Sequence, residues 1–362
     1  MDGHREAEDG MIDIVIPMHN DWDALLELLP ELDEAAGAWE ESVRVIVVDD
    51  GSLHHQPELV QEMGGLHHIR EVRFCRLASN LGHQRAIAVG LVEAFRDGGA
   101  HAVAVMDCDG EDRPEDLDAL LRALRADGER VVVAQRTRRS EPAWFRGAYH
   151  LYRLLFRMLT GRRIDFGNFL LIPRRFLESL VHAPGIWNHV ASAVIRLRLP
   201  LTRVATVRGE RSQGRSSMDP TGLVTHGLSA VSVFSDAVFV RVLLFSFALS
   251  AATAGGIGAV VGIRLFTDLA IPGWATNAAG LLFIIFLQAV ILSAAAAVLL
   301  LNARSTEAMV PALDAERYVW ERSVFGMEGG VGEASDGSPG EPVAPSAVDG
   351  SAADALSEGD RP

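Results

Sequence analysis

Two long runs without a charged residue most constrain how this 362-residue chain folds. Residues 242–263 are 22 uncharged residues, and residues 269–303 are 35 more. About 20 apolar residues suffice to cross the hydrocarbon core of a bilayer. The link at 264–268 is short, so the runs are predicted to form a helical hairpin whose outer ends lie on one side of a membrane. The alternative is a pair of core helices in a soluble protein.

The residues around the hairpin predict its orientation. Arg241 and Arg304 flank the outer ends, but Arg264 lies in the link, so the bias of basic residues to one side is weak. Residues 1–11 are polar and acidic and do not read as an export signal. We therefore expect a multi-pass protein of the inner or plasma membrane whose N-terminal domain and C-terminal tail are cytoplasmic.

The first half of the chain alternates β-rich runs with helical patterns. Near-continuous apolar strands separated by helices predict an α/β fold with a mostly parallel sheet covered on both faces. Ligands of such sheets bind beyond the carboxyl ends of the strands. The predicted strands are 12–16, 43–48, 72–77, 102–106 and 131–134, and the predicted helices are 22–37, 83–96 and 114–126.

Charge is distributed unevenly along the chain. The formal charge of −15 argues against nucleic acid as a partner, because such a site needs a basic surface. All 33 basic residues are Arg, so a lysine Schiff base is excluded and any phosphate clamp must use guanidinium forks. Ten arginines against two carboxylates lie between residues 136 and 175. That local excess suits anionic head groups or phosphates.

Two acidic clusters follow predicted strands. Asp107, Asp109 and Glu111 come directly after the strand at 102–106. Carboxylates that converge there supply oxygen ligands for a hard divalent cation, which would neutralise a diphosphate leaving group. The alternative is an acidic loop that only caps the next helix. The second cluster, at 49–52, is a common turn by itself, and beside the first it suggests recognition of a base or ribose.

The order of four motifs resembles that of family 2 glycosyltransferases with a GT-A fold. The motifs are Ile16-Pro17-Met18-His19-Asn20, Val47-Val48-Asp49-Asp50-Gly51-Ser52, Asn80-Leu81-Gly82-His83-Gln84 and Asp107-Cys108-Asp109. With the hairpin added, the chain is similar to the polyprenyl-phosphate glycosyltransferase branch, which includes dolichol-phosphate mannose synthase and its bacterial relatives. The resemblance covers about residues 11–305.

The resemblance implies a donor site. The nucleotide pocket would be lined by Pro17, His19, Asn20, Asp49, Asp50, Gly51, Asn80 and Asp107. Mg²⁺ or Mn²⁺ would be held by Asp107, Asp109 and Glu111, the last of which stands where relatives commonly have Gln. The phosphates of the donor and the acceptor would be bound by Arg136, Arg146, Arg211 and Arg215.

The resemblance also implies a catalytic carboxylate. Asp165, in Asp165-Phe166-Gly167-Asn168-Phe169, matches the residue that is the usual candidate for catalytic base. A phosphate acceptor is already an anion near neutral pH, so Asp165 would then position the acceptor more than deprotonate it. The alternative is a turn residue that pairs with Arg162 or Arg163.

Residues 144–160 are predicted to form a helix with a basic face. Arg146, His150, Arg153 and Arg157 fall on one side at helical spacing. This helix would lie in the membrane interface with its arginines toward lipid phosphates or the acceptor phosphate. The alternative is an amphipathic helix with a solvated basic face. The twelve histidines show no zinc-ligand spacing and are expected in loops.

The activity implied is inverting transfer of a sugar from a nucleotide diphosphate to a polyprenyl phosphate, of the undecaprenyl or decaprenyl type, at the cytoplasmic membrane face. Membrane lipids are expected partners, and self-association is left open. The alternatives are a processive or other-acceptor GT-A membrane glycosyltransferase and a non-catalytic membrane scaffold that keeps the fold.

Five regions are expected along the chain. They are a flexible N-terminus at 1–10, a GT-A domain at 11–235, a transmembrane hairpin at 236–305, a juxtamembrane segment at 306–324 and a disordered acidic tail at 325–362. Because it contains Tyr318 and Trp320, the juxtamembrane segment is expected at the membrane interface.

Overall fold

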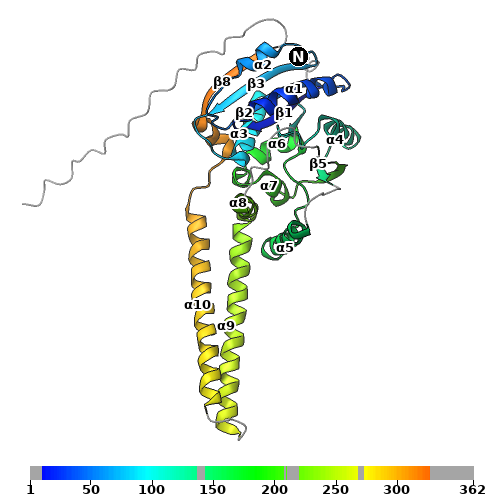
Figure 1. The fold of residues 1–362 in the computed structure, drawn as a ribbon. Helices are drawn as coiled ribbons and strands as arrows, with labels where there is room; N and C mark the ends of the chain where they lie inside the picture. The colour runs from blue at the N-terminus through cyan, green and yellow to red at the C-terminus, as the bar shows by residue number, and fades with distance from the viewer. Residues whose placement is uncertain (1–9, 137–142, 208, 210–219, 268–272, 327–362) are drawn as a thin grey trace, which may run out of the picture.

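An α/β domain stands on one end of a long helical hairpin (Figure 1). The computed structural model describes residues 10–136, 143–207, 209, 220–267 and 273–326. One eight-stranded sheet runs in the order β7-β5-β6-β4-β1-β2-β3-β8. The strands are β1 (Met11–Met18), β2 (Ser42–Asp49), β3 (Ile69–Leu77), β4 (Ala102–Val105), β5 (Val131–Arg136), β6 (Leu170–Pro173), β7 (Leu201–Thr206) and β8 (Val319–Gly326).

Helices connect the strands and form the hairpin. They are α1 (Trp22–Ala36), α2 (Glu58–Met63), α3 (His83–Asp97), α4 (Pro114–Ala126), α5 (Ala143–Thr160), α6 (Arg174–Val181), α7 (Val190–Arg196), α8 (Pro220–Ser232), α9 (Ser235–Phe266), α10 (Trp274–Ser305) and α11 (Pro311–Asp314). Two short 3₁₀ helices are η1 (Pro184–Trp187) and η2 (Ala315–Tyr318).

The sheet is mostly parallel, as the sequence predicts. β1 pairs in parallel with both β2 and β4, and β2 pairs in parallel with β3. β6 and β8 are antiparallel to the strands beside them. In the β1–β2 register Met18 lies beside Asp49, so the polar loops that follow the two strands meet at one edge of the sheet.

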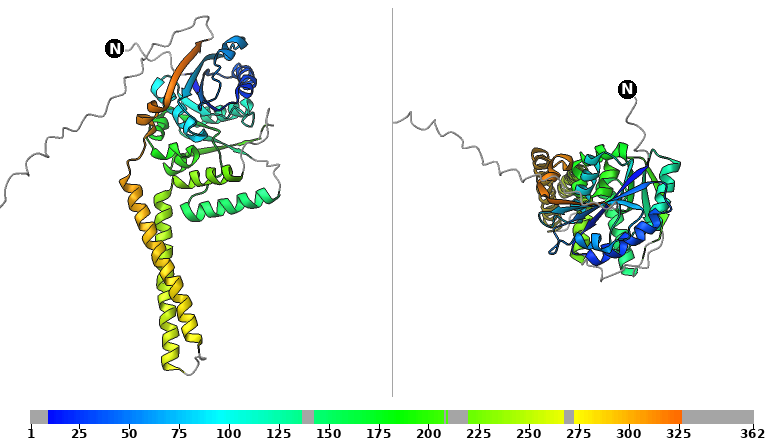
Figure 2. Two further views of the ribbon diagram at one scale, coloured as in Figure 1. Left: turned by 60° about the vertical axis from the view of Figure 1, so that its left-hand side comes forward. Right: turned by 90° about the horizontal axis from the view of Figure 1, so that it is seen from above.

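Helices cover both faces of the sheet, as Figure 2 shows from above. On one face Val15 and Val48 pack in a core with α3, α6 and α7, and on the other Ile14 and Val47 pack in a core with α1 and α4. Gly90 of α3 lets the helix approach β1 closely, because a Cβ at this position would lie 2.3 Å from a methyl carbon of Val15. The close fit fixes the start of α3 against the carboxyl ends of β1 and β2.

The chain returns to the sheet after the hairpin, and this corrects the juxtamembrane prediction for 306–324. β8 pairs with β3, with Phe74 opposite Ser323. The rings of Phe74 and Phe325 lie 5.8 Å apart, edge to face. The open edge of β3 offers unpaired main-chain groups, and an added strand satisfies them. The predicted tail also starts too early, because Phe325 and Gly326 belong to β8.

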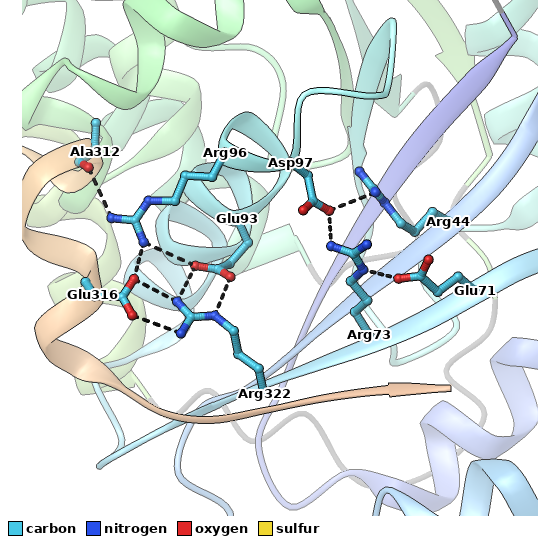
Figure 3. A network of polar contacts seen from close by, with 9 residues as sticks. All are labelled: Arg44, Glu71, Arg73, Glu93, Arg96, Asp97, Ala312, Glu316 and Arg322. Carbon is cyan, nitrogen blue, oxygen red and sulfur yellow. Dashed lines mark hydrogen bonds and ion pairs between the residues drawn. The ribbon is translucent and has the colours of Figure 1, made fainter. Parts of the chain in front are cut away.

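Ion pairs attach this returning segment to α3 (Figure 3). Arg322 Nη2 donates to Glu93 Oε1 at 3.0 Å and to Glu316 Oε2 at 2.8 Å. Arg96 of α3 also pairs with Glu316. The segment is therefore held both by the β3 edge and by a four-residue charge network.

The hairpin prediction is confirmed. α9 and α10 pack along each other (Figure 1), and each has 32 residues, or about 48 Å at 1.5 Å per residue. That length exceeds the roughly 30 Å hydrocarbon core of a bilayer. Only 11% of the most apolar window of each helix is buried. A soluble core helix would be mostly buried, so the membrane interpretation is the better one.

α5 lies across the foot of the α/β domain, crosswise to the hairpin (Figure 2). It packs against α8 and α9. Four large apolar side chains of α5 remain exposed, by 46% to 65%: Leu151, Leu154, Leu155 and Met158. Their spacing of three and four residues makes one stripe on the helix. An apolar stripe that the protein itself does not bury indicates contact with another apolar phase or partner.

Candidate active site

Hydrogen bonds join the loop that follows β1 to the loop that follows β2. The main-chain N–H of Asn20 donates to Ser52 Oγ at 2.8 Å, and the Asn20 side-chain oxygen accepts from Leu53 N at 2.9 Å. His19 Nδ1 lies 2.9 Å from the main-chain oxygen of Asp50. Asn20 has a φ of 57°, a left-handed conformation that Asn tolerates better than most residues. These contacts fix the positions of the polar side chains in the two loops at this edge of the sheet.

Asp49 is fully buried and held within its own loop. Its Oδ1 accepts from Ser52 N at 2.9 Å, and its Oδ2 lies 2.6 Å from His55 Nδ1. Burial alone would raise the pKa of Asp49, but the contacts from His55 and Ser52 lower it overall. Both oxygens are engaged, so Asp49 shapes the loop around the predicted nucleotide pocket.

Asp50 holds the two residues that precede α3. Its carboxylate accepts from Leu81 N at 2.6 Å and from Gly82 N at 2.9 Å. Burial raises its pKa, and the two N–H donors counter only part of that rise. The neighbouring Gly51 has a φ of 67°, and a Cβ there would lie 2.6 Å from Asn80 N. Asp50 and Gly51 thus bring the Asn80 loop against the loop after β2.

A pocket of about 280 Å³ lies beside this loop pair. Its lining residues are Gly51, Ser52, Arg76, Leu77, Ala78 and Trp320. Trp320 belongs to β8, so the segment after the hairpin borders the candidate site. No sequence pattern pointed to Arg76 or Trp320 at this place.

The acidic loop after β4 does not gather its three predicted metal ligands. Within the described residues, no group of three or more His, Cys, Asp and Glu side chains is placed to hold one metal ion. Asp109 Oδ1 accepts from Glu111 N at 3.0 Å, so this carboxylate stabilises its own turn. Asp107 lies instead beside His83, with Oδ1 3.4 Å from the imidazole Nε2.

A chain of hydrogen bonds connects His83 to the loop that carries Asp165. Val190 N donates to Gln84 Oε1 at 2.9 Å, and Gln84 Nε2 donates to Asn168 Oδ1 at 3.0 Å. Asn168 Nδ2 then lies 3.0 Å from His83 Nε2. Asn168 is 84 positions from Gln84 and 85 positions from His83 in the sequence, which is why local patterns did not reveal these hydrogen bonds.

His83 of the site lies near two further histidines, His189 and His226. The His189 and His226 rings are 4.9 Å apart, and His83 acts on the pKa of both. Burial lowers the pKa of His189 to about 3, with His226 and His83 adding to the effect. His226 belongs to α8, which packs against α9. α8 thus connects the histidine cluster to the hairpin.

The histidine prediction is partly wrong. His83 begins α3, and His226 lies inside α8. Burial lowers the pKa of His83, and Asp109, Asp50 and Asp112 oppose that decrease. Both side chains occupy helical positions at the candidate site rather than loops.

Asp165 is held by two residues that the sequence did not suggest. Gln135 Nε2 donates to Asp165 Oδ2 at 3.1 Å, and Arg203 Nε donates to the same oxygen at 3.1 Å. Its partner is therefore Arg203 of β7, rather than the Arg162 or Arg163 of the turn alternative. A guanidinium and an amide on one carboxylate fix its orientation.

The predicted phosphate arginines are only partly placed. Arg136 ends β5 and Arg146 lies in α5. Arg211 and Arg215 lie outside the described residues. Gly209 N donates to the Glu111 main-chain oxygen at 3.0 Å, so Gly209 lies against the acidic loop.

The comparisons with known proteins agree with this architecture. Residues 13–185 match the model of Glycosyl transferase family 2. The match supports the family resemblance for this part of the chain. That stretch contains the four loop motifs and Asp165, which lie at one edge of the sheet and around the start of α3.

Two curated relatives that are similar to the chain share one activity in their names. The chain is 28% identical to an undecaprenyl-phosphate 4-deoxy-4-formamido-L-arabinose transferase of Edwardsiella ictaluri, over 66% of this chain and 75% of the relative. A transferase of the same name from Pseudomonas savastanoi is 26% identical, over 59% and 62%. The chain thus spans about three fifths to three quarters of these relatives.

A solved structure is also similar to the chain. It is glucosyl-3-phosphoglycerate synthase from Mycobacterium tuberculosis in complex with Mn²⁺, uridine-diphosphate-glucose and phosphoglyceric acid. The identity is 17% and the TM-score 0.45, with 64% of this chain and 80% of that chain covered.

Proposed function

We propose that the protein transfers a sugar, with inversion, from a nucleotide diphosphate to a polyprenyl phosphate at the cytoplasmic face of a membrane. The curated relatives support this acceptor class, since their names specify undecaprenyl phosphate. The observation that carries the proposal is the exposed apolar stripe of α5 at the foot of the domain beside the hairpin. A soluble acceptor would not need such a surface next to the site.

The position of α5 connects that surface to the chemistry. α5 ends at Thr160, five residues before Asp165. With its stripe in the membrane interface, α5 would hold the Asp165 loop at the level of the lipid phosphates. The predicted basic side chains of α5, Arg153 and Arg157, are exposed and suit anionic head groups.

The reaction needs alignment and charge neutralisation more than proton transfer. A phosphate oxygen of the acceptor attacks the anomeric carbon as the bond to the nucleotide diphosphate breaks. The acceptor is already an anion near neutral pH, so Asp165, oriented by Gln135 and Arg203, positions it. A divalent cation near Asp107 would neutralise the departing diphosphate.

A membrane assay tests this proposal. Membranes containing the protein are incubated with undecaprenyl phosphate, Mn²⁺ or Mg²⁺ and a panel of radiolabelled nucleotide sugars, and label entering the organic phase is counted. At least one donor is expected to label the lipid, and Asp107→Asn is expected to abolish the signal. Asp127→Asn is the matched control, because Asp127 ends α4 away from the motif loops and is exposed.

The results separate the proposal from its alternatives. Label in the lipid that is unchanged in Asp107→Asn would contradict the role of Asp107. No label in lipid with any donor, together with no cation-dependent binding of UDP or GDP, would favour the non-catalytic scaffold. Label that enters a water-soluble polymer instead would favour the processive alternative.

A further inference from the structure

One amide side chain lies in the middle of the uncharged run of α10. Gln288 is 14 residues after Trp274 and 17 residues before Ser305, which is about 21 Å and about 26 Å from the two ends of the helix. Both distances are shorter than the roughly 30 Å hydrocarbon core of a bilayer. A core of that thickness, placed anywhere along the helix, therefore contains Gln288.

α9 does not cover this amide. Gln288 is exposed, whereas the buried residues of α10, which packs along α9, are Ala289 and Ala296. These two lie about 80–100° around the helix from Gln288. The hydroxyls of Thr253 and Ser293 each donate to the carbonyl four residues earlier in their own helix, at 2.9 Å. Among the described residues, no hydrogen bond to the Gln288 amide is present.

An amide at this depth needs a partner from another helix. Its oxygen accepts and its NH₂ group donates, and the hydrocarbon core supplies neither water nor lipid groups that could replace these bonds. Polar side chains within membrane spans accordingly face other helices and form hydrogen bonds across the contact. The side of α10 that carries Gln288 is therefore expected to be covered by another helix.

The residues on this side repeat in the pattern of a helix–helix contact. Steps of three and four residues alternate, and an average step of 3.5 keeps two helices in contact along their length. The four large apolar members are exposed by 53% to 65%, and Ala295 is small enough to let two backbones approach closely. We define the α10 seam as Leu281, Ile284, Gln288, Ile291, Ala295 and Val298.

We propose that a second copy of this chain packs against the α10 seam, with the two Gln288 amides hydrogen-bonded to each other. Two copies with their α/β domains on the same side of the membrane have parallel α10 helices. Gln288 then lies at the same depth in both, and each amide has the donor and the acceptor that the other needs. A two-fold axis along the membrane normal brings each seam against the same seam of its partner.

The shape of the protein leaves this side of the hairpin open. α5 packs against α9, and α10 lies on the other side of α9 from α5 (Figures 1 and 2). One polar residue in an otherwise apolar seam also sets the register of the two helices. The inference requires only that the hairpin spans a membrane, so it holds for a transferase and for a non-catalytic scaffold alike.

Disulfide cross-linking in membranes tests the contact. Ala295→Cys puts a thiol in the α10 seam, and Ala294→Cys puts the same thiol at the adjacent exposed position, about 100° around the helix. Oxidation with copper phenanthroline is expected to give several-fold more dimer of the full-length chain from Ala295→Cys than from Ala294→Cys. The natural Cys75 and Cys108 are buried, and the unsubstituted chain measures their background.

Gln288→Leu tests the amide itself, because Leu keeps the helix apolar and removes the hydrogen bond. Energy transfer between labelled copies, measured at increasing dilution in lipid vesicles, gives the dissociation constant of the dimer. It is expected to rise by about 3- to 30-fold in Gln288→Leu, and Gln288→Asn, which keeps an amide, is expected to retain most of the association. Val290→Leu, at an exposed apolar position about 160° around the helix, is the matched control.

Each of the remaining outcomes overturns the proposal. Equal cross-linking of Ala294→Cys and Ala295→Cys, or a dissociation constant unchanged by Gln288→Leu, excludes the α10 seam as the contact. A dimer that forms without any cross-link in Ala295→Cys places the association elsewhere on the chain. A cross-link from Ala295→Cys to a different protein, identified by its mass, replaces the second copy as the occupant. The transfer assay is independent of all these results.

Discussion

Arg241 Nη1 donates a hydrogen bond to the main-chain oxygen of Met158 at 2.8 Å. Arg241 lies in α9 just before its uncharged run, and Met158 lies in the last turn of α5. A guanidinium at a helix C-terminus can donate to a carbonyl that has no partner within the helix. Its positive charge also interacts favourably with the negative end of the helix dipole. This contact therefore ties the crosswise helix to the start of the hairpin.

Gly161 gives a test of that junction. It has a φ of 75°, and a Cβ there would lie 2.1 Å from Arg241 Nη2. Gly161→Ala is expected to reduce the free energy of unfolding by about 1–3 kcal/mol through backbone strain, and to displace Arg241. Gly147→Ala, inside α5 with open space around it, is the control and should stabilise by about 0.5–1 kcal/mol. Thermal unfolding in detergent measures the stability of both variants. Equal effects of the two substitutions would contradict a special role of Gly161 at this junction.

The exposed stripe of α5 should control use of the lipid acceptor. Replacing Leu151 and Met158 by Asp puts two charges where an apolar phase is expected, which costs several kcal/mol of interfacial binding. KM for undecaprenyl phosphate is expected to rise by about 10-fold or more, while nucleotide binding by calorimetry stays the same. The control pair is Arg122→Asp and Arg130→Asp, on solvent-exposed parts of the α4 side. An unchanged KM in the Leu151 and Met158 variant would show that the stripe does not meet the membrane.

The charge network of Figure 3 should hold β8 on the sheet. Arg322 contacts both Glu93 and Glu316, and hydrogen bonding to Glu93 raises its pKa, so it stays charged. Arg322→Met is expected to leave Glu93 and Glu316 with Arg96 as their one remaining partner in this network, and to speed amide exchange in β8. Hydrogen exchange by mass spectrometry reads this out. Arg317→Met, at a mostly exposed neighbour, should leave amide exchange in β8 unchanged. A similar increase in this control variant would contradict the role of the charge network in holding β8.

Asp33 is expected to make stability depend on pH. Its carboxylate accepts from the main-chain N–H groups of His67, His68 and Ile69. Burial would raise its pKa, but these donors lower it below the ordinary 3.8. A depressed pKa stabilises the fold above pH 3.8 and loses that contribution as pH falls through the folded value.

Asp33→Asn is the matching variant. It is expected to lower the free energy of unfolding by about 1–3 kcal/mol at pH 7, and the difference from the natural chain should shrink below pH 3.8. Asp23→Asn, exposed in the first turn of the same helix, serves as control. A difference for Asp33→Asn that is constant from pH 7 to pH 3 would contradict the assigned cause.

The sequence predicted the parts of the fold whose signal is local. The strands at 12–16, 43–48 and 72–77 are present because their apolar residues are buried between two helical layers, although Arg73 and Arg76 interrupt the third run. β6 is as long as β4, but it was missed because it lies outside the alternation of strands and helices and pairs antiparallel with β4 and β5. β8 was missed because Glu321 and Arg322 look like surface residues, and their partners lie on β3 and α3.

The same limit applies to the site. The acidic loops and Asp165 follow from motifs that occupy consecutive residues. Gln84 and Asn168 are 84 residues apart and meet only because α3 starts beside the loop before β6. Arg203 joins Asp165 across 38 residues through the pairing of β5 with β7. Such partners depend on strand order, which no single segment specifies.

The return of β8 to β3 has a consequence for how the molecule is made. The last strand of the sheet is synthesised after both hydrophobic helices, so the α/β domain stays incomplete until the hairpin has left the ribosome. Until then β3 presents an open edge, a template for pairing with other chains. A shortened chain that ends before the hairpin would keep that edge permanently and would be prone to aggregate even without its hydrophobic helices.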